Sequence, residues 1–136
     1  MKRYILDSGI VTDLINRRNG VDEKATKAFK HGGRLGVGTP VLGELLAVLH
    51  NSSSRKKNLP RLERALANLA LWPFDEGAAR QYGEIAGDLR RRGIAIQQID
   101  MQIAAIAFAL GKCVVVSKDE DFREIKGLTV ENWATP

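Results

Sequence analysis

Two aspartates stand at positions where the chemistry of this chain could take place. Asp7 follows the short apolar run Tyr4 to Leu6, and Asp119 comes shortly after the apolar run Cys113 to Val116. Such runs are typical of strands buried in a parallel sheet. Because ligands bind beyond the carboxyl ends of strands in open α/β sheets, we expect both carboxylates on one rim. Aspartate also caps helices and forms turns, and that alternative stays open at each position.

Two further acids belong to predicted helices. Asp100 stands at the head of Met101 to Leu110, a largely apolar segment that predicts a buried helix, so its carboxylate could reach the mouth of the fold. Glu44 lies at the edge of an apolar helical face that begins after Thr39. A capping box after Thr39 would need its acid at Leu42, so Glu44 is not explained as a cap. The alternative for Glu44 is a solvated residue beside the apolar stripe.

If these acids converge, they need a cation. Two carboxylates about 5 Å apart repel by roughly 3 kcal/mol at an effective dielectric constant of about 20. Mg²⁺ or Mn²⁺ would offset this repulsion, because hard cations prefer oxygen ligands. His31 and His50 are isolated and lack the spacing of zinc ligands. The sequence therefore predicts an oxygen-ligated site for one or two divalent ions, formed by Asp7, Glu44, Asp100 and Asp119.

The elements that must position these acids alternate between short apolar strands and helices. The predicted strands are Tyr4 to Leu6, Leu35 to Gly38, Leu71 to Phe74, Cys113 to Val116 and Leu128 to Val130. Three predicted helices have bounds: Asp22 to Lys30, Asp75 to about Arg92, and Met101 to Leu110. Three more are each indicated by one feature: one carries Ile10 to Ile15, one has Thr39 as its N-cap, and one is opened by Pro60 after the solvated loop Asn51 to Asn58. This alternation predicts an α/β sandwich with a central, mainly parallel sheet flanked by helices.

Length and composition fit one domain spanning residues 1–136. No apolar stretch approaches the roughly 20 residues of a membrane helix, and the apolar start is too short for a signal peptide, so we expect a cytoplasmic protein. The single cysteine, Cys113, excludes a disulfide framework. Lys and Arg outnumber Asp and Glu by 21 to 16, and the formal charge of +5 favours attraction to polyanions. Candidate guides for a phosphate backbone are Arg55 to Lys57, Arg90 to Arg92 and Lys118.

Five segments form a fairly specific pattern through their order and spacing. They are Ile5 to Ile10, Thr39 to Leu45, Asp100 to Ala105, Val115 to Phe122, and Gly127-Leu128 with Trp133. Together they resemble the PIN-domain nucleases over nearly the whole chain, and in particular the VapC-type toxins of prokaryotic toxin-antitoxin pairs. The resemblance implies a three-layer PIN-like fold, a four-acid site that uses Mg²⁺ or Mn²⁺, and endoribonuclease activity on RNA. It also implies an antitoxin partner whose C-terminal segment covers the groove, and a homodimer.

Within this resemblance, Asp7, Glu44 and Asp100 match the first three acids of the family. The fourth has two candidates. Family members often carry Thr-Asn-Asp before an Asp-Phe pair, which matches Ser117 to Asp119 and then Asp121. We therefore expect Asp119 as the fourth ligand, with Asp121 as a secondary candidate.

The chain departs from the family after the first acid, where Ser8-Gly9 replaces the common Thr-Asn. Gly9 lacks an amide side chain that could support the site. The main hypothesis is metal-dependent hydrolysis of RNA, in which the acids hold metal against the scissile phosphate and activate a water. The alternative, which Gly9 favours, is a non-catalytic module of the same fold that binds nucleic acid or protein.

Overall fold

A parallel sheet forms the centre of the molecule. Within residues 1–135, which the computed structural model describes, five strands lie in the spatial order β3-β2-β1-β4-β5, and every neighbouring pair is parallel. The strands are β1 Arg3–Leu6, β2 Arg34–Gly38, β3 Ala70–Trp72, β4 Cys113–Val116 and β5 Val130–Glu131. The prediction of a central, mainly parallel sheet is confirmed.

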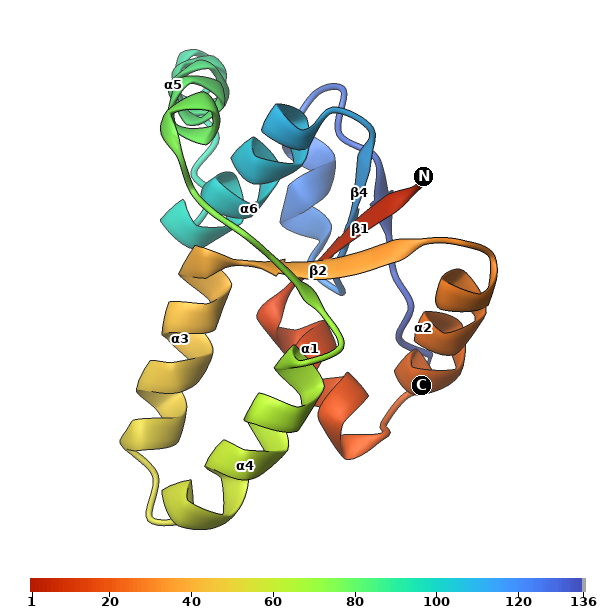
Figure 1. Cartoon of the computed structure of the whole chain (residues 1–136). Coiled ribbons are helices and arrows are strands. Elements are labelled where there is room, and N and C mark those ends of the chain that lie inside the picture. The colour runs from red at the N-terminus through yellow and green to blue at the C-terminus, as the bar shows by residue number, and fades with distance from the viewer. Residues whose placement is uncertain (136) are drawn as a thin grey trace.

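Helices cover both faces of this sheet and complete three layers (Figure 1). They are α1 Ser8–Asn16, α2 Val21–Lys30, α3 Thr39–His50, α4 Arg55–Leu66, α5 Glu76–Arg91 and α6 Gln98–Leu110, with the short 3-10 helix η1 Glu120–Glu124. The chain steps outward from β1 to β2 to β3, then returns to β4 on the other side of β1. Right-handed crossovers therefore place α1 to α4 on one face and α5 and α6 on the other. In Figure 1, α3 and α4 extend away from the sheet side by side.

Burial of the sheet on both faces explains why its strands are continuous apolar runs in the sequence. Ile5, Leu6 and Val115 have no exposed surface, because helices cover both faces of the sheet. The α6 segment is buried by the same packing, and Ile103 to Ala107 are almost fully shielded from solvent. No helix in the described part of the chain is long and apolar enough to cross a membrane.

Two predictions about helix starts are wrong. Thr39 is not an N-cap: α3 begins at Thr39 after Gly38, and the Thr39 hydroxyl instead accepts a hydrogen bond from the Phe74 N–H at 3.1 Å. Pro60 does not open α4, which begins at Arg55 and contains the proline. The first turn forms early because the N–H groups of Lys57 and Asn58 donate to the Ser54 carbonyl. Pro60 is exposed on this helix and has no N–H to donate to the carbonyl four residues earlier.

Smaller shifts affect the other boundaries. The loop predicted over Asn51 to Asn58 is shorter in the structure and ends at Ser54. Strand β3 begins one residue and ends two residues earlier than predicted, and β5 begins at Val130. Helix α6 begins at Gln98, so Asp100 lies within its first turn. These shifts leave each predicted acid at the same end of the sheet.

Candidate metal centre

The switch point of the sheet lies between β1 and β4. Leu6 pairs with Val116 across these strands, and the Asp7 N–H donates to the Val116 carbonyl at 3.0 Å. The chain continues to opposite sides of the sheet from this point, which opens a crevice beyond the carboxyl ends of the two strands. Asp7 and Asp119 follow these strands, so both lie at the crevice as predicted.

A buried serine links the two strand ends. Ser117 is 2% exposed, and its hydroxyl donates to Asp7 Oδ2 at 2.7 Å. The same hydroxyl oxygen accepts a hydrogen bond from the Asp119 N–H at 3.0 Å. Ser117 therefore fixes Asp7 relative to the loop that carries Asp119.

Asp7 and Asp119 also cap helices. Asp7 is the N-cap of α1, where its Oδ1 accepts from the Ser8 N–H at 2.8 Å. Asp119 precedes η1, where its Oδ1 accepts from the Asp121 N–H at 2.9 Å. The capping explanation for these two aspartates is thus correct as far as one oxygen of each carboxylate is concerned.

Asp100 has no such structural role. It is 4% exposed, and its Oδ2 is buried with no hydrogen-bond partner among the described residues. Burial, the negative charges of Asp7, Asp119 and Asp121, and a hydrogen bond with Asp119 together raise the pKa of Asp100 to about 7. A buried carboxylate oxygen without a partner is costly, and a bound cation would satisfy it.

Three acids offer ligand atoms that all lie within 4.8 Å of one another: Asp100 from α6, and Asp119 and Asp121 from the segment after β4. Asp100 is buried, whereas the other two are exposed. Carboxylate oxygens at this separation suit a hard divalent cation that keeps several waters. Asp121 therefore stands beside Asp119 in this group, although the sequence pattern ranked it second. Asp7 lies outside the group of three, but its charge acts on Asp100.

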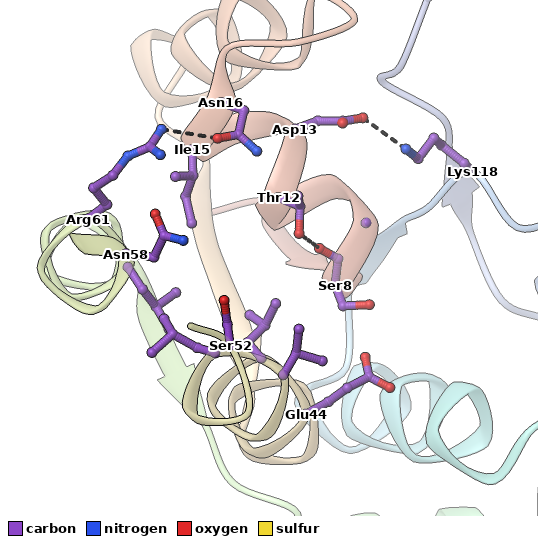
Figure 2. A pocket seen from close by; sticks show the side chains of 15 residues that line it. Ser8, Thr12, Asp13, Ile15, Asn16, Glu44, Ser52, Asn58, Arg61 and Lys118 are labelled. Carbon is purple, nitrogen blue, oxygen red and sulfur yellow. Dashed lines mark hydrogen bonds and ion pairs between the residues drawn. The ribbon is translucent and has the colours of Figure 1, made fainter. Parts of the chain in front are cut away.

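Glu44 lies apart from these three acids. It is half-buried on α3 and lines a hollow of about 570 Å³ that also includes Ser8 and Gly9. In Figure 2 the Glu44 carboxylate points toward the α1 end that carries Ser8, the residue after Asp7. Glu44 thus borders the hollow next to the acidic group rather than the group itself.

The candidate phosphate guides differ in their surroundings. Arg92 donates to Asp88 Oδ2 at 2.7 Å and to the Glu124 carbonyl at 2.6 Å, so it serves the packing of α5. Arg55 to Lys57 lie exposed at the start of α4. Lys118 lines the same hollow as Glu44 and forms an ion pair of 2.9 Å with Asp13 of α1.

Asp13 is the residue at this site that sequence reasoning missed. It is 5% exposed and accepts a hydrogen bond from Asn19 Nδ2 at 3.1 Å as well as from Lys118. Burial alone would raise the pKa of Asp13, but the hydrogen bonds from Asn19 and Lys118 and the charge of Lys118 hold it below its usual value. Its position in the α1 pattern gave no signal, because the lysine that binds it is 105 residues away in the sequence.

These features define a doubly wound α/β protein with a candidate divalent-metal centre at its switch point. The model of the PIN domain family matches residues 4–128, and the chain belongs to this family. The resemblance inferred from the five sequence segments is confirmed.

Similarity to individual proteins extends over the whole domain. The chain is 32% identical over 129 residues to ribonuclease VapC1 of Rickettsia felis, with 93% of this chain and 92% of that protein aligned. It is 26% identical over 133 residues to the tRNA(fMet)-specific endonuclease VapC of Salmonella typhimurium, with 98% of this chain and 99% of that protein aligned. The crystal structure of VapBC2 from Rickettsia felis, bound to a promoter DNA fragment, has a TM-score of 0.89 and 26% identity, covering 96% of this chain and 98% of that chain.

Proposed function

We propose that this protein is a divalent-metal-dependent endoribonuclease and the toxin of a VapBC-type pair. The observation that supports this most directly is the buried Oδ2 of Asp100, which has no hydrogen-bond partner within residues 1–135 and lies beside Asp119 and Asp121. Burying a carboxylate oxygen without a hydrogen-bond partner costs stability, and binding a cation would offset that cost. The names of the similar proteins, ribonuclease VapC1 and tRNA(fMet)-specific endonuclease VapC, supply the reaction class.

Each acid has a distinct role in this proposal. Asp100, Asp119 and Asp121 hold Mg²⁺, or Mn²⁺ in its place, and Asp7 adds its charge from the end of β1. Glu44 faces the substrate side of the group from α3 and acts directly or through water. A bound divalent cation would lower the pKa of a water and offset charge on the phosphate. Ser117 orients Asp7, and the N-cap of η1 orients Asp119.

The proton on Asp100 couples this site to pH. With a pKa of about 7, the metal-free carboxyl group is partly protonated at neutral pH. A cation binds the ionised form, so binding releases this proton. Metal affinity should therefore rise as the pH increases through 7.

The charge of the whole chain fits a polyanionic substrate. The formal charge is +5 although the crevice itself is acidic. A cation at the acids would invert the local charge, while basic residues around the hollow attract the RNA backbone.

The proposed partners follow from the VapBC likeness. A small antitoxin would cover the groove beside the acids, and two copies of this chain would form a homodimer. Support for the antitoxin comes from the VapBC2 structure of Rickettsia felis, which matches nearly the whole of this chain. The homodimer is proposed from the family resemblance alone. We place this pair in the cytoplasm, where its RNA substrate lies.

The test is cleavage of a fluorescent single-stranded RNA by the purified protein in EDTA, Mg²⁺ and Mn²⁺. Cleavage should require metal, and Asp7→Asn or Asp100→Asn should lower it on the order of 100-fold or more. Glu84→Gln, which changes an exposed acid on α5, is the matched control and should cleave normally. Metal-independent cleavage, or full activity in a folded Asp100→Asn protein, would refute the proposal.

A second candidate is a non-catalytic binding module of the same fold, which the absence of a side chain at Gly9 favours. In that case the RNA would be bound in Mg²⁺ and Mn²⁺ but remain uncut. The same titration separates the two functions, because intact and cleaved RNA are distinguished on a gel.

A further inference from the structure

Lys118 is held in a fixed place at the edge of the acidic group. Its ammonium nitrogen lies 2.9 Å from Oδ2 of Asp13, whose side chain is 8% exposed. The residues on either side, Ser117 and Asp119, are themselves fixed by the hydrogen bonds at the switch point. The lysine is thus tethered at both ends, unlike a surface lysine whose long side chain moves freely.

Gly9 makes room for this lysine. A Cβ atom at Gly9 would lie 3.3 Å from Cε of Lys118, which is a tight contact, and 3.7 Å from its Nζ, which is an ordinary van der Waals distance. The stem of Lys118 therefore runs against the first turn of α1. In the family pattern, asparagine is common at both of these positions. Gly9 and Lys118, which both replace that asparagine, thus lie next to each other in space.

The ammonium group keeps hydrogen-bonding capacity toward the hollow. An ammonium group has three N–H donors, and Asp13 accounts for one of them. The Lys118 side chain is 44% exposed, and the residue lines the hollow together with Ser8 and Glu44 (Figure 2). The carboxylate that it binds is Asp13, which is not one of the candidate metal ligands Asp100, Asp119 and Asp121.

We propose that Lys118 binds a phosphate of the RNA strand next to the one that is cut, and that Asp13 orients its ammonium group. This inference rests on the proposed function, because it assigns a substrate contact to that site. A phosphodiester entering between Glu44 and the acids meets negative charge, and a fixed cation on the opposite wall offsets it. Lys118 is then a substrate-binding residue, and Asp13 is a positioning residue.

Salt dependence of binding tests this contact directly. Affinity for a fluorescent 20-nucleotide RNA is measured by anisotropy between 50 and 300 mM NaCl in Ca²⁺, with the RNA checked for integrity on a gel. Lys118→Met should weaken binding on the order of fivefold at 100 mM salt and reduce the slope of log K against log[salt] by about 0.7, the value for one phosphate of a single strand. A merely structural role would not change this slope.

Three further variants keep the test interpretable. Asp13→Asn retains the charge of Lys118, so the slope should stay at the wild-type value while affinity falls about twofold through loss of orientation. The double variant Asp13→Asn/Lys118→Met removes both charges of the ion pair, so the Asp13 carboxylate is not left buried without its lysine. It should show the same reduced slope as Lys118→Met. Lys126→Met is the matched control: Lys126 is 74% exposed and 4.0 Å from Asp88, and its loss should change neither quantity.

The results separate this inference from the proposed function. A wild-type slope in the folded Asp13→Asn/Lys118→Met protein overturns the role of Lys118, even if that protein still cleaves RNA in Mn²⁺. A wild-type protein that does not bind RNA overturns both. A reduced slope in both Lys118 variants, with the Lys126 control unchanged, supports the contact whether or not the RNA is cut.

Discussion

Replacing Asp100 by Asn should stabilise the metal-free protein. Asparagine is a neutral near-isostere of the protonated carboxyl group, and Asp100 is 4% exposed in a cluster of acids. The raised pKa means that the folded protein holds this proton more tightly than the unfolded chain. Stability therefore falls as the pH rises from 3.8 to about 7, and the whole cost is present above pH 7.

The size of this effect follows from the pKa. A change from 3.8 to about 7 corresponds to about 4 kcal/mol for the fully ionised group. Asp119 and Asp121 are exposed, so water screens part of their repulsion. We expect Asp100→Asn to raise the free energy of unfolding by about 2 kcal/mol at pH 8. At pH 4 the difference should shrink toward zero, because the native carboxyl group is then protonated.

Bound metal should reverse the order of stability of wild type and Asp100→Asn. A cation at 100 times its dissociation constant stabilises the folded state by about 2.7 kcal/mol. The variant lacks one carboxylate ligand, so at the same Mn²⁺ concentration it should gain much less. Wild type should therefore be the less stable protein in EDTA and the more stable one in saturating Mn²⁺.

Urea unfolding followed by tryptophan fluorescence measures both differences, in EDTA and in Mn²⁺, at pH 8 and pH 4. Glu84→Gln, the exposed acid on α5, should match wild type in all four conditions. The reasoning is refuted if Asp100→Asn is less stable than wild type in EDTA at pH 8, or if Mn²⁺ stabilises the two proteins equally.

Three other expectations follow from single contacts. Ser117→Ala removes the 2.7 Å hydrogen bond to Asp7 and the acceptor of the Asp119 N–H, so Mn²⁺ affinity measured by calorimetry should fall about tenfold; unchanged affinity would argue against this link. Asp13→Asn should lower stability at pH 7 by about 1 kcal/mol, and urea unfolding should show this loss disappear below pH 3.8 as the lowered native pKa is passed. Burial raises the pKa of Cys113 to about 11, so a thiol reagent should label it at pH 8 only after unfolding; rapid labelling of the native protein would contradict its burial.

The strand ends could be predicted from the sequence because their signals are local. Continuous apolar runs before Asp7 and before Ser117 indicate strands covered on both faces, and parallel strands bring their carboxyl ends together. Asp100 could be predicted for a similar reason, since the helix behind it is apolar nearly all round. Local sequence patterns are therefore enough to predict which edge of the sheet the acids share.

Contacts between distant segments could not be predicted in this way. The separations within the acidic group depend on how α6 packs against the sheet, and nothing in the sequence distinguished Asp119 from Asp121 by distance. The pairing of Asp13 with Lys118 depends on the crossing of α1 and the loop after β4, together with the space left at Gly9. The early start of α4 was missed because Pro60 is a strong helix-start signal that here lies inside the helix.

The competing explanations of the aspartates, as caps or as ligands, turn out not to exclude each other. A helix that begins directly after a parallel strand has its N-cap residue at the crevice, where ligands bind. Asp7 and Asp119 therefore cap with one oxygen while the carboxylate stays at the site, and their capping hydrogen bonds decide nothing about function. The diagnostic residue is the acid that caps nothing. Asp100 is buried inside the first turn of α6, and its Oδ2 has no hydrogen-bond partner in the described part of the chain. Folding alone does not explain this cost, and a bound cation would remove it.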